Sequence, residues 1–231
     1  MASTSIILAS ASPRRRQLLA ALGLAFDVIP ADVDESPLPS VPPGALARRL
    51  ACAKAHKVAQ QFPEALVIAA DTLVTVEGGI LGKPTSPQEA VLMLKRLRGR
   101  RHWVYSGIAL CWAAAHRQGA WVAETPVWMR SYSDEEIRRY VATGDPLDKA
   151  GAYAVQHAEF APVARLEGCY ANVVGLPLCH LYRALQAWGV VPPRTSLEAC
   201  PWAVEHGGCE WAGAILEGGW LTPMRGCDDA E

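Results

Sequence analysis

The sequence has little that would mark a membrane, secreted or nucleic-acid-binding protein. No stretch approaches the roughly 18 uninterrupted apolar residues of a membrane span, so no membrane partner is expected. Its 22 Lys and Arg residues against 23 Asp and Glu give a net charge of −1, so broad nucleic-acid binding is not expected either. The apolar run Ile6–Ala9 precedes its arginines, which reverses the order of a signal peptide, and a cytoplasmic location is therefore expected.

Several cofactor and metal motifs are missing as well. The seven cysteines are odd in number and include no C-x-x-C pair, so reduced thiols are expected in place of a disulfide framework. The nearest approach to a zinc site is Cys200, His206, Cys209 and Cys227, which lack the paired ligand spacing. A G-x-G-x-x-G after a strand, a G-x-S-x-G elbow and a Walker A loop are also absent. Zinc, a dinucleotide cofactor and an α/β-hydrolase mechanism are therefore not indicated.

What is present is the composition of a globular protein. The 231 residues are 51% hydrophobic and 19% charged, enough to bury a substantial core. Apolar runs of strand length alternate with helical patterns, which predicts an α/β fold with a mixed sheet. Strands are expected at 5–9, 26–29, 66–70, 72–76, 80–81, 103–114, 120–131 and 168–175, and helices at 14–22, 44–61, 86–97, 133–141 and 177–188. Capping boxes are predicted at Ser86 with Glu89 and at Ser133 with Glu136.

The clearest candidate site is Ser10-Ala11-Ser12-Pro13-Arg14-Arg15, at a strand-to-helix junction. Ser12 followed by Pro13 is typical of an N-cap with proline in the first helical position. Main-chain N–H groups at a helix start attract anions, and hydroxyls and guanidiniums add donors suited to phosphate oxygens. The alternative is an ordinary capped helix whose arginines are solvated.

A second candidate is Asp71-Thr72, directly after the expected strand 66–70. A carboxylate at the end of such a strand faces the crevice in which α/β folds bind ligands. Asp71 is therefore a candidate metal ligand or general base, with a turn or cap aspartate as the alternative. Lys83, held between Gly82 and Pro84, has a constrained backbone and suits a phosphate as a point charge.

Weaker candidates are scattered along the chain. They are Asp32, Asp34 and Glu35 in the proline-rich loop 30–43, Lys54 on the next helix, and Gln156 after the small-residue loop 148–153. Each is typical of a solvated surface group, although the amide of Gln156 also suits the edge of a base. Together with the basic junction they indicate cations and carboxylates around a polyphosphate and a metal ion.

The order of these motifs resembles one family. The segments LASASPRRRQLLAALGL, VDES, AADTLV, GILGKP, LRGRRHWVYSGIAL, YVATGDPLDKAGAYAVQ and EGCYANVVGLPL are similar to the Maf family of septum-formation-inhibitor-like proteins and nucleoside triphosphate pyrophosphatases. The resemblance covers about residues 5–188. It implies an elongated mixed sheet flanked by helices, of the Maf and ITPase-like kind, with two lobes around a nucleotide cleft. It also implies a domain at 1–189 and a tail at 190–231 without a counterpart.

The resemblance further implies which residues act in catalysis. It puts the catalytic and metal-binding aspartate at Asp71, and a second metal-binding carboxylate at Asp34 or Glu35, of which we favour Glu35. It puts a helix lysine at Lys54 and the G-K-P lysine at Lys83. The implied cofactor is a divalent cation, Mg²⁺ or Mn²⁺.

Substrate-binding positions follow in the same way. The resemblance puts phosphate contacts at Ser10, Arg14 and Arg15. In the branch that prefers dTTP and UTP, the specificity positions correspond to Arg14, Thr72 and Gln156, and the string LDKAGAY also resembles that branch.

Two functions are therefore in competition. The first is metal-dependent hydrolysis of dTTP or UTP to the monophosphate and pyrophosphate, with Asp71 orienting or deprotonating the attacking water. The alternative is a non-catalytic nucleotide-binding regulator of cell division, as the family's older name suggests. The expected partner is a nucleoside triphosphate, and a homodimer is the assembly common among similar proteins.

Overall fold

A single mixed sheet runs the length of the molecule. The computed structural model describes residues 5–35, 41–218 and 227. The strand order is β2-β1-β3-β5-β6-β7, with β4 paired to β3. The strands are β1 (Ile6–Leu8), β2 (Asp27–Val28), β3 (Leu66–Val76), β4 (Gly79–Leu81), β5 (Arg101–Trp112), β6 (Arg117–Met129) and β7 (Val163–Leu166). β1 is parallel to β2 and β3, and the remaining pairs are antiparallel, so the predicted mixed α/β sheet is confirmed.

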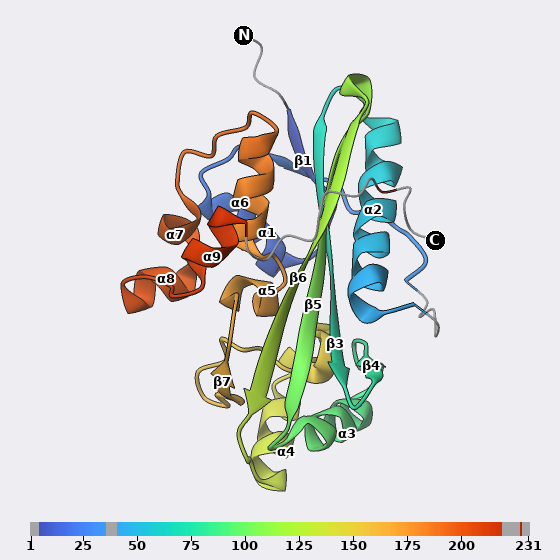
Figure 1. Cartoon of the computed structure of the whole chain (residues 1–231). Coiled ribbons are helices and arrows are strands. Elements are labelled where there is room, and N and C mark those ends of the chain that lie inside the picture. The colour runs from blue at the N-terminus through green and yellow to red at the C-terminus, as the bar shows by residue number, and fades with distance from the viewer. Residues whose placement is uncertain (1–4, 36–40, 219–226, 228–231) are drawn as a thin grey trace.

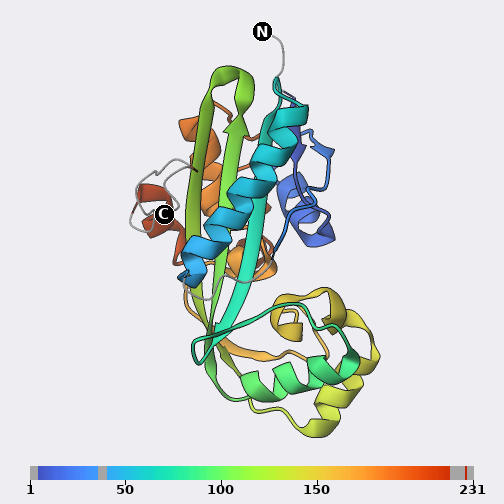
Figure 2. The same cartoon turned by 90° about the vertical axis from the view of Figure 1, so that its right-hand side faces the viewer.

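Helices cover both faces of this sheet. α1 (Pro13–Ala21), α5 (Tyr170–Val174) and α6 (Leu178–Ala187) lie on one face, and α2 (Pro43–Gln61) lies on the other (Figure 1). α3 (Pro87–Leu97) and α4 (Asp134–Ala142) build a smaller lower lobe, seen at the bottom of Figure 2. The upper part of the sheet has one hydrophobic cluster on each face, and the helices α3 and α4 pack around a third cluster. The long strands β3, β5 and β6 are therefore shared between two lobes, as expected.

Helix starts follow the local sequence closely. Ser12 caps α1 by accepting a bond from the Arg15 N–H, with proline in the first turn, and Ser133 and Glu136 form the predicted capping box of α4. At α3 only half of the predicted box forms. Ser86 accepts from the Glu89 N–H at 3.1 Å, but the Glu89 carboxylate accepts from the N–H and hydroxyl of Thr85 instead of from Ser86.

Two strand predictions are wrong. Residues 168–175 are not a strand: Tyr170–Val174 is helix α5, and the strand that pairs with β6 is the unpredicted Val163–Leu166. The cause is tertiary, because the buried Asn172 side chain donates to Val104 O and Thr125 Oγ1 at 3.0 Å each. β3 also continues through Asp71 to Val76, so Asp71 lies in mid-strand opposite Gly107 and not at a strand end.

A gap in the pairing of β3 opens one edge of the sheet. β1 accompanies β3 only as far as Ile68, and β4 joins it only from Val74. In the part of the chain that the structure describes, residues 69–73 therefore have β5 on one side and no strand on the other. Asp71 and Thr72 lie in this gap, at the junction of the two lobes.

Residues 190–218, which follow α6, pack against the upper lobe. They contain α7 (Ser196–Ala199), α8 (Pro201–His206) and α9 (Ala212–Glu217), which lie beside α6 in Figure 1. Side chains of this segment join the main hydrophobic cluster, namely Ala199, Cys200, Ala203, Ala212 and Ile215. The described part of the segment thus contributes to the core.

The expectation of wholly reduced cysteines is wrong at one pair. Cys52 on α2 and Cys227 form a disulfide, with their Cα atoms 5.7 Å apart and a sequence separation of 175 residues. The bond ties residue 227 to the helix on the sheet face opposite α7–α9. Sequence spacing could not reveal it, because pairs so distant are brought together only by the fold.

This pairing predicts a thiol count. Protein purified without reductant and then denatured should titrate as five thiols, because Cys111, Cys169, Cys179, Cys200 and Cys209 are free, and as seven after reduction. Cys227→Ser should show six thiols without reduction, because Cys52 is released. Seven thiols in the unreduced wild-type protein would contradict the disulfide.

Helix α2 packs directly on the backbone of β5 at Gly107. A Cβ at this position would overlap the carbonyl oxygen of Ala47. Gly107→Ala should therefore push α2 away from the sheet and lower the free energy of unfolding by about 1–3 kcal/mol, as overpacking usually does. Urea denaturation measures the change. Gly213→Ala, with no atom within 4 Å of the added Cβ, is the matched control and should not destabilise.

Candidate active site

One cavity collects the residues singled out in the sequence. It has a volume of about 580 Å³, lies at the gap in β3, and is lined from both lobes. It is lined by nine residues to which the family resemblance assigns a role: Ser10, Arg14, Arg15, Glu35, Lys54, Asp71, Thr72, Lys83 and Gln156. Asp34 is not among the lining residues, so the geometry favours Glu35 as the loop carboxylate facing the cavity.

The centre of the cavity is a lysine between two carboxylates. Lys54 Nζ lies 2.5 Å from Asp71 Oδ1 and 2.6 Å from Glu35 Oε1. The side chains of Lys54 and Asp71 are only 7% and 8% exposed, whereas that of Glu35 is 54% exposed. Buried charges persist in proteins when they are paired. The surface interpretation of Lys54 is therefore wrong, since this lysine joins α2, β3 and the acidic loop.

The cations around Glu35 keep it ionised. Partial burial alone raises the pKa of this carboxyl, but the hydrogen bond and charge of Lys54, with the charges of Lys83 and Arg15, outweigh burial and hold the pKa below its usual value. The cavity therefore presents two carboxylates, Asp71 and Glu35, linked through one ammonium group.

Arg15 is fastened to protein acceptors. Its Nε donates to Gly175 O at 2.9 Å, its Nη2 to Thr72 Oγ1 at 3.0 Å and its Nη1 to Ser10 Oγ at 3.4 Å. Burial lowers the pKa of this guanidinium, although the charges of Asp71 and Glu35 act in the opposite direction. Arg15 thus connects the start of α1 to β3 and to the turn after α5.

The hydroxyl of Thr72 belongs to the same network. Thr72 Oγ1 lies 2.8 Å from Ser106 Oγ and 3.4 Å from Gly175 O, and Ser106 Oγ donates to Asn172 O at 3.3 Å. Because alternate residues of a strand face opposite sides of a sheet, Thr72 faces α5 whereas Asp71 faces α2. The sequence alone did not single out Gly175 or Asn172, which act through main-chain atoms and a buried amide.

The lower lobe contributes a pair from the loop 148–153, to which the sequence assigned no role of its own in the site. Arg14 Nη1 lies 3.1 Å from Asp148 Oδ2, and Lys149 Nζ lies 2.6 Å from Asp148 Oδ1. Lys83 and Gln156, from the same lobe, line the cavity as well. The sequence signals for Asp148 and Lys149 were the run of small residues that follows them and their place in the string LDKAGAY.

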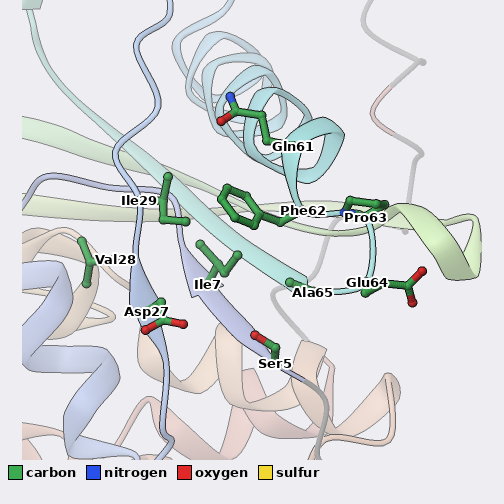
Figure 3. Close-up of a pocket in the computed structure, with 10 residues that line it drawn as sticks. All are labelled: Ser5, Ile7, Asp27, Val28, Ile29, Gln61, Phe62, Pro63, Glu64 and Ala65. Carbon is green, nitrogen blue, oxygen red and sulfur yellow. The ribbon is translucent and has the colours of Figure 1, made fainter.

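A second cavity, of about 630 Å³, is unsuited to a polyanion. It lies between β2 and the end of α2, where Asp27, Phe62 and Glu64 border it (Figure 3). Its ten lining residues include two carboxylates and neither lysine nor arginine. The charged cavity at β3 is therefore the candidate active site.

The donor set at Lys54 is compatible with a divalent cation bound together with a ligand. Within residues 5–35, 41–218 and 227, no three His, Cys, Asp or Glu side chains form a complete metal site. Mg²⁺, however, is usually held by one or two carboxylates together with substrate phosphates. Asp71 and Glu35 supply those carboxylates, so the site fits an ion that arrives with a phosphate chain.

Fold and site together define a class: an α/β protein with a cleft between two lobes that is lined by lysine, arginine and carboxylate side chains. A comparison with protein-family models agrees, because the model described as Maf-like protein matches residues 5–188. The chain belongs to the Maf family, as the motifs in its sequence suggested.

Similar curated proteins span nearly the whole family domain. This chain is 50% identical over 187 residues to a protein of Moorella thermoacetica named dTTP/UTP pyrophosphatase, covering 81% of this chain and 96% of that protein. Proteins of the same name from Pelotomaculum thermopropionicum and Carboxydothermus hydrogenoformans are 49% and 47% identical, each covering 80% of this chain and 96% and 98% of their own lengths.

Among solved structures, the Staphylococcus aureus Ham1 protein matches with a TM-score of 0.41 and 18% identity, covering 69% of this chain and 91% of that one. In the described part of this chain, no helix is long and apolar enough to cross a membrane.

The Lys54 pairing makes a prediction about titration. Lys54→Met removes the hydrogen bond and the charge that lower the pKa of Glu35, so this pKa should rise. Carboxyl ¹³C NMR of the protein without ligand measures the change. Lys95→Met, which removes one of the two cationic partners of Asp134, is the control and should leave the pKa of Glu35 unchanged. An unaltered Glu35 titration in Lys54→Met would contradict the pairing.

Proposed function

We propose that this protein hydrolyses nucleoside triphosphates, with dTTP and UTP preferred, to the monophosphate and pyrophosphate. The observation that carries the proposal is the buried Lys54, paired with Asp71 and Glu35 in a cavity that Arg14 and Lys83 also line. Support comes from relatives named dTTP/UTP pyrophosphatase, up to 50% identical over 81% of this chain.

Asp71 acts on the attacking water in this proposal. Lys54 bonds Oδ1 of Asp71, which leaves Oδ2 to accept a hydrogen bond from water and to take its proton. The ammonium also fixes the orientation of the Asp71 carboxyl group through the same contact. Water so oriented attacks the α-phosphorus, and pyrophosphate leaves.

The surrounding cations stabilise the charge of the phosphates. Lys54, Lys83 and Arg14 neutralise the phosphate oxygens and the leaving pyrophosphate, because phosphoryl transfer is catalysed mainly by positioning and electrostatics. Arg15 and Ser10 shape the phosphate-binding turn at the start of α1.

A divalent cation, Mg²⁺ or Mn²⁺, is the proposed cofactor. Asp71 and Glu35 would hold it, with phosphate oxygens as further ligands. When bound, the ion supplies additional positive charge at the phosphates. Both carboxylates remain paired with Lys54, which orients them toward the ligand.

Base recognition is proposed for the face of β3 that lies opposite Asp71 and carries Thr72. Thr72 has its hydroxyl fixed by Arg15 and Ser106, and Gln156 presents an amide that can donate and accept hydrogen bonds. The imide edge of thymine or uracil needs both kinds of partner. With Arg14 nearby, these residues form the proposed specificity set.

We also propose that residues 1–189 are the catalytic domain and that residues 190–231 are an addition to it. The proposed location is the cytoplasm, where free nucleotides are the partners, and a homodimer is the assembly that light scattering should test.

Removing the Asp71 carboxylate tests the catalytic role. Asp71→Asn should lower dTTP turnover by about 10²- to 10⁴-fold, the usual contribution of a general base, with the fold retained. Pyrophosphate release with Mg²⁺ or Mn²⁺ is the measurement, and circular dichroism checks folding. Asp134→Asn is the control, because this carboxylate pairs with Lys95 and Arg98 and does not line the cavity.

Three outcomes would contradict the proposed function. Near wild-type turnover by Asp71→Asn would rule out the role of this carboxylate. Release of orthophosphate would indicate a different phosphohydrolase. Absence of metal-dependent turnover with any nucleoside triphosphate would favour the non-catalytic regulator.

A further inference from the structure

An ion pair joins the two lobes at the candidate site. Arg14 lies on α1 of the upper lobe, and Asp148 closes the 3-10 segment Asp145–Asp148 of the lower lobe. Arg14 Nη1 lies 3.1 Å from Asp148 Oδ2, and Arg14 Nη2 donates to Asp148 O at 3.3 Å. Both residues line the cavity that holds Asp71.

Asp148 is anchored independently of Arg14. Its Oδ1 accepts from Lys149 Nζ at 2.6 Å, and the same ammonium donates to Asp145 Oδ1 at 2.8 Å. Lys149 is only 7% exposed, and Tyr140 donates to Asp145 at 2.7 Å. Partial burial raises the pKa of Asp148, but Lys149 and Arg14 outweigh it and lower this pKa, so the carboxylate stays charged. Asp148 therefore keeps its place when Arg14 moves.

The donors of Arg14 are used by Asp148. In the described part of the chain, Asp148 is the hydrogen-bond partner of both terminal nitrogens of Arg14. Two oxygens of a phosphate would need those same nitrogens, since an arginine binds phosphate through a two-pronged contact. Arg15 differs, because its partners are the neutral acceptors Gly175 O, Thr72 Oγ1 and Ser10 Oγ.

We propose that Asp148 competes with the ligand's phosphate groups for Arg14, releasing the guanidinium when pyrophosphate or a triphosphate binds and recapturing it when pyrophosphate leaves. The proposal rests on the proposed function for the identity of the ligand. It makes Asp148 a positioning residue that sets how tightly product is held.

Because the ion pair is partly exposed to solvent, breaking it costs little free energy. The side chains of Arg14 and Asp148 are 22% and 58% exposed, and ion pairs open to solvent are weak. A phosphate chain carries several negative charges and displaces a single carboxylate. Asp148 therefore lowers ligand affinity without blocking the site.

The test measures the affinity of inorganic pyrophosphate by calorimetry on the full-length protein. Asp148→Asn should bind pyrophosphate about two- to fivefold more tightly, the range expected from losing a weak competing ion pair. Asp145→Asn is the matched control: it removes the same charge from the same segment but has no bond to Arg14, so its affinity should change by less than about twofold. Asp148→Glu keeps the carboxylate and should bind as the wild type does.

A double-mutant comparison separates competition from simple loss of charge. In an Arg14→Gln background, Asp148→Asn should no longer change pyrophosphate affinity, because the guanidinium for which Asp148 and pyrophosphate compete is absent. Equal tightening in both backgrounds would overturn the proposal, as would an Asp148→Asn variant that binds pyrophosphate no better than the wild type. If Asp148→Asn fails to fold, Asp148→Ser replaces it in the same comparison.

This readout is independent of turnover. A wild-type protein that binds pyrophosphate with the predicted pattern but releases none from any nucleotide would refute the proposed function and leave the competition intact. If the wild-type protein hydrolyses dTTP but Asp148→Asn does not bind pyrophosphate more tightly, the competition is refuted and the proposed function stands.

Discussion

The position of one buried ammonium group constrains much of this molecule. Lys54 can neutralise Asp71 only if α2 lies close to the sheet, and α2 can lie that close only because Gly107 has no side chain. Strand β3 must also continue past Ala70, so that Asp71 lies within the strand and its carboxylate faces Lys54. A surface loop then brings Glu35 to the same nitrogen. The packing of α2, the length of β3 and the path of the acidic loop are thus all needed to pair Lys54 with Asp71 and Glu35.

Interrupted strand pairing accounts for the place of the cleft. Where β1 ends and β4 has not begun, the edge of β3 lies between the lobes, and both faces of the strand take part in the site. A continuous neighbouring strand would have closed this edge. The cleft is therefore a property of the topology, and its charged lining is a property of the side chains.

Local signals in the sequence predicted much of the fold. The Ser12 cap, the Ser133–Glu136 box and the long β5–β6 pair follow from neighbouring residues, and all are present. The failures involve distant partners: Asn172 turns an apolar run into a helix through bonds to other strands, and Cys52 meets a cysteine 175 positions away. Among the site residues, Lys54 is typical of a surface lysine by its sequence context, and only the family resemblance indicated a role in the site. The loop that contains Asp148 was noted, but its contact with Arg14 could not be predicted, because the two residues are 134 positions apart.

The alternation of side chains along β3 has a consequence for how this protein can diverge. Asp71 faces α2 and Lys54, whereas Thr72 faces α1 and α5 through Arg15 and Gly175. Adjacent residues thus pack in different surroundings on the two faces of one strand, although both line the same cavity. Packing against one face of β3 can therefore change without direct contact with the other face, while the charges of Arg15, Asp71 and Glu35 still act on one another.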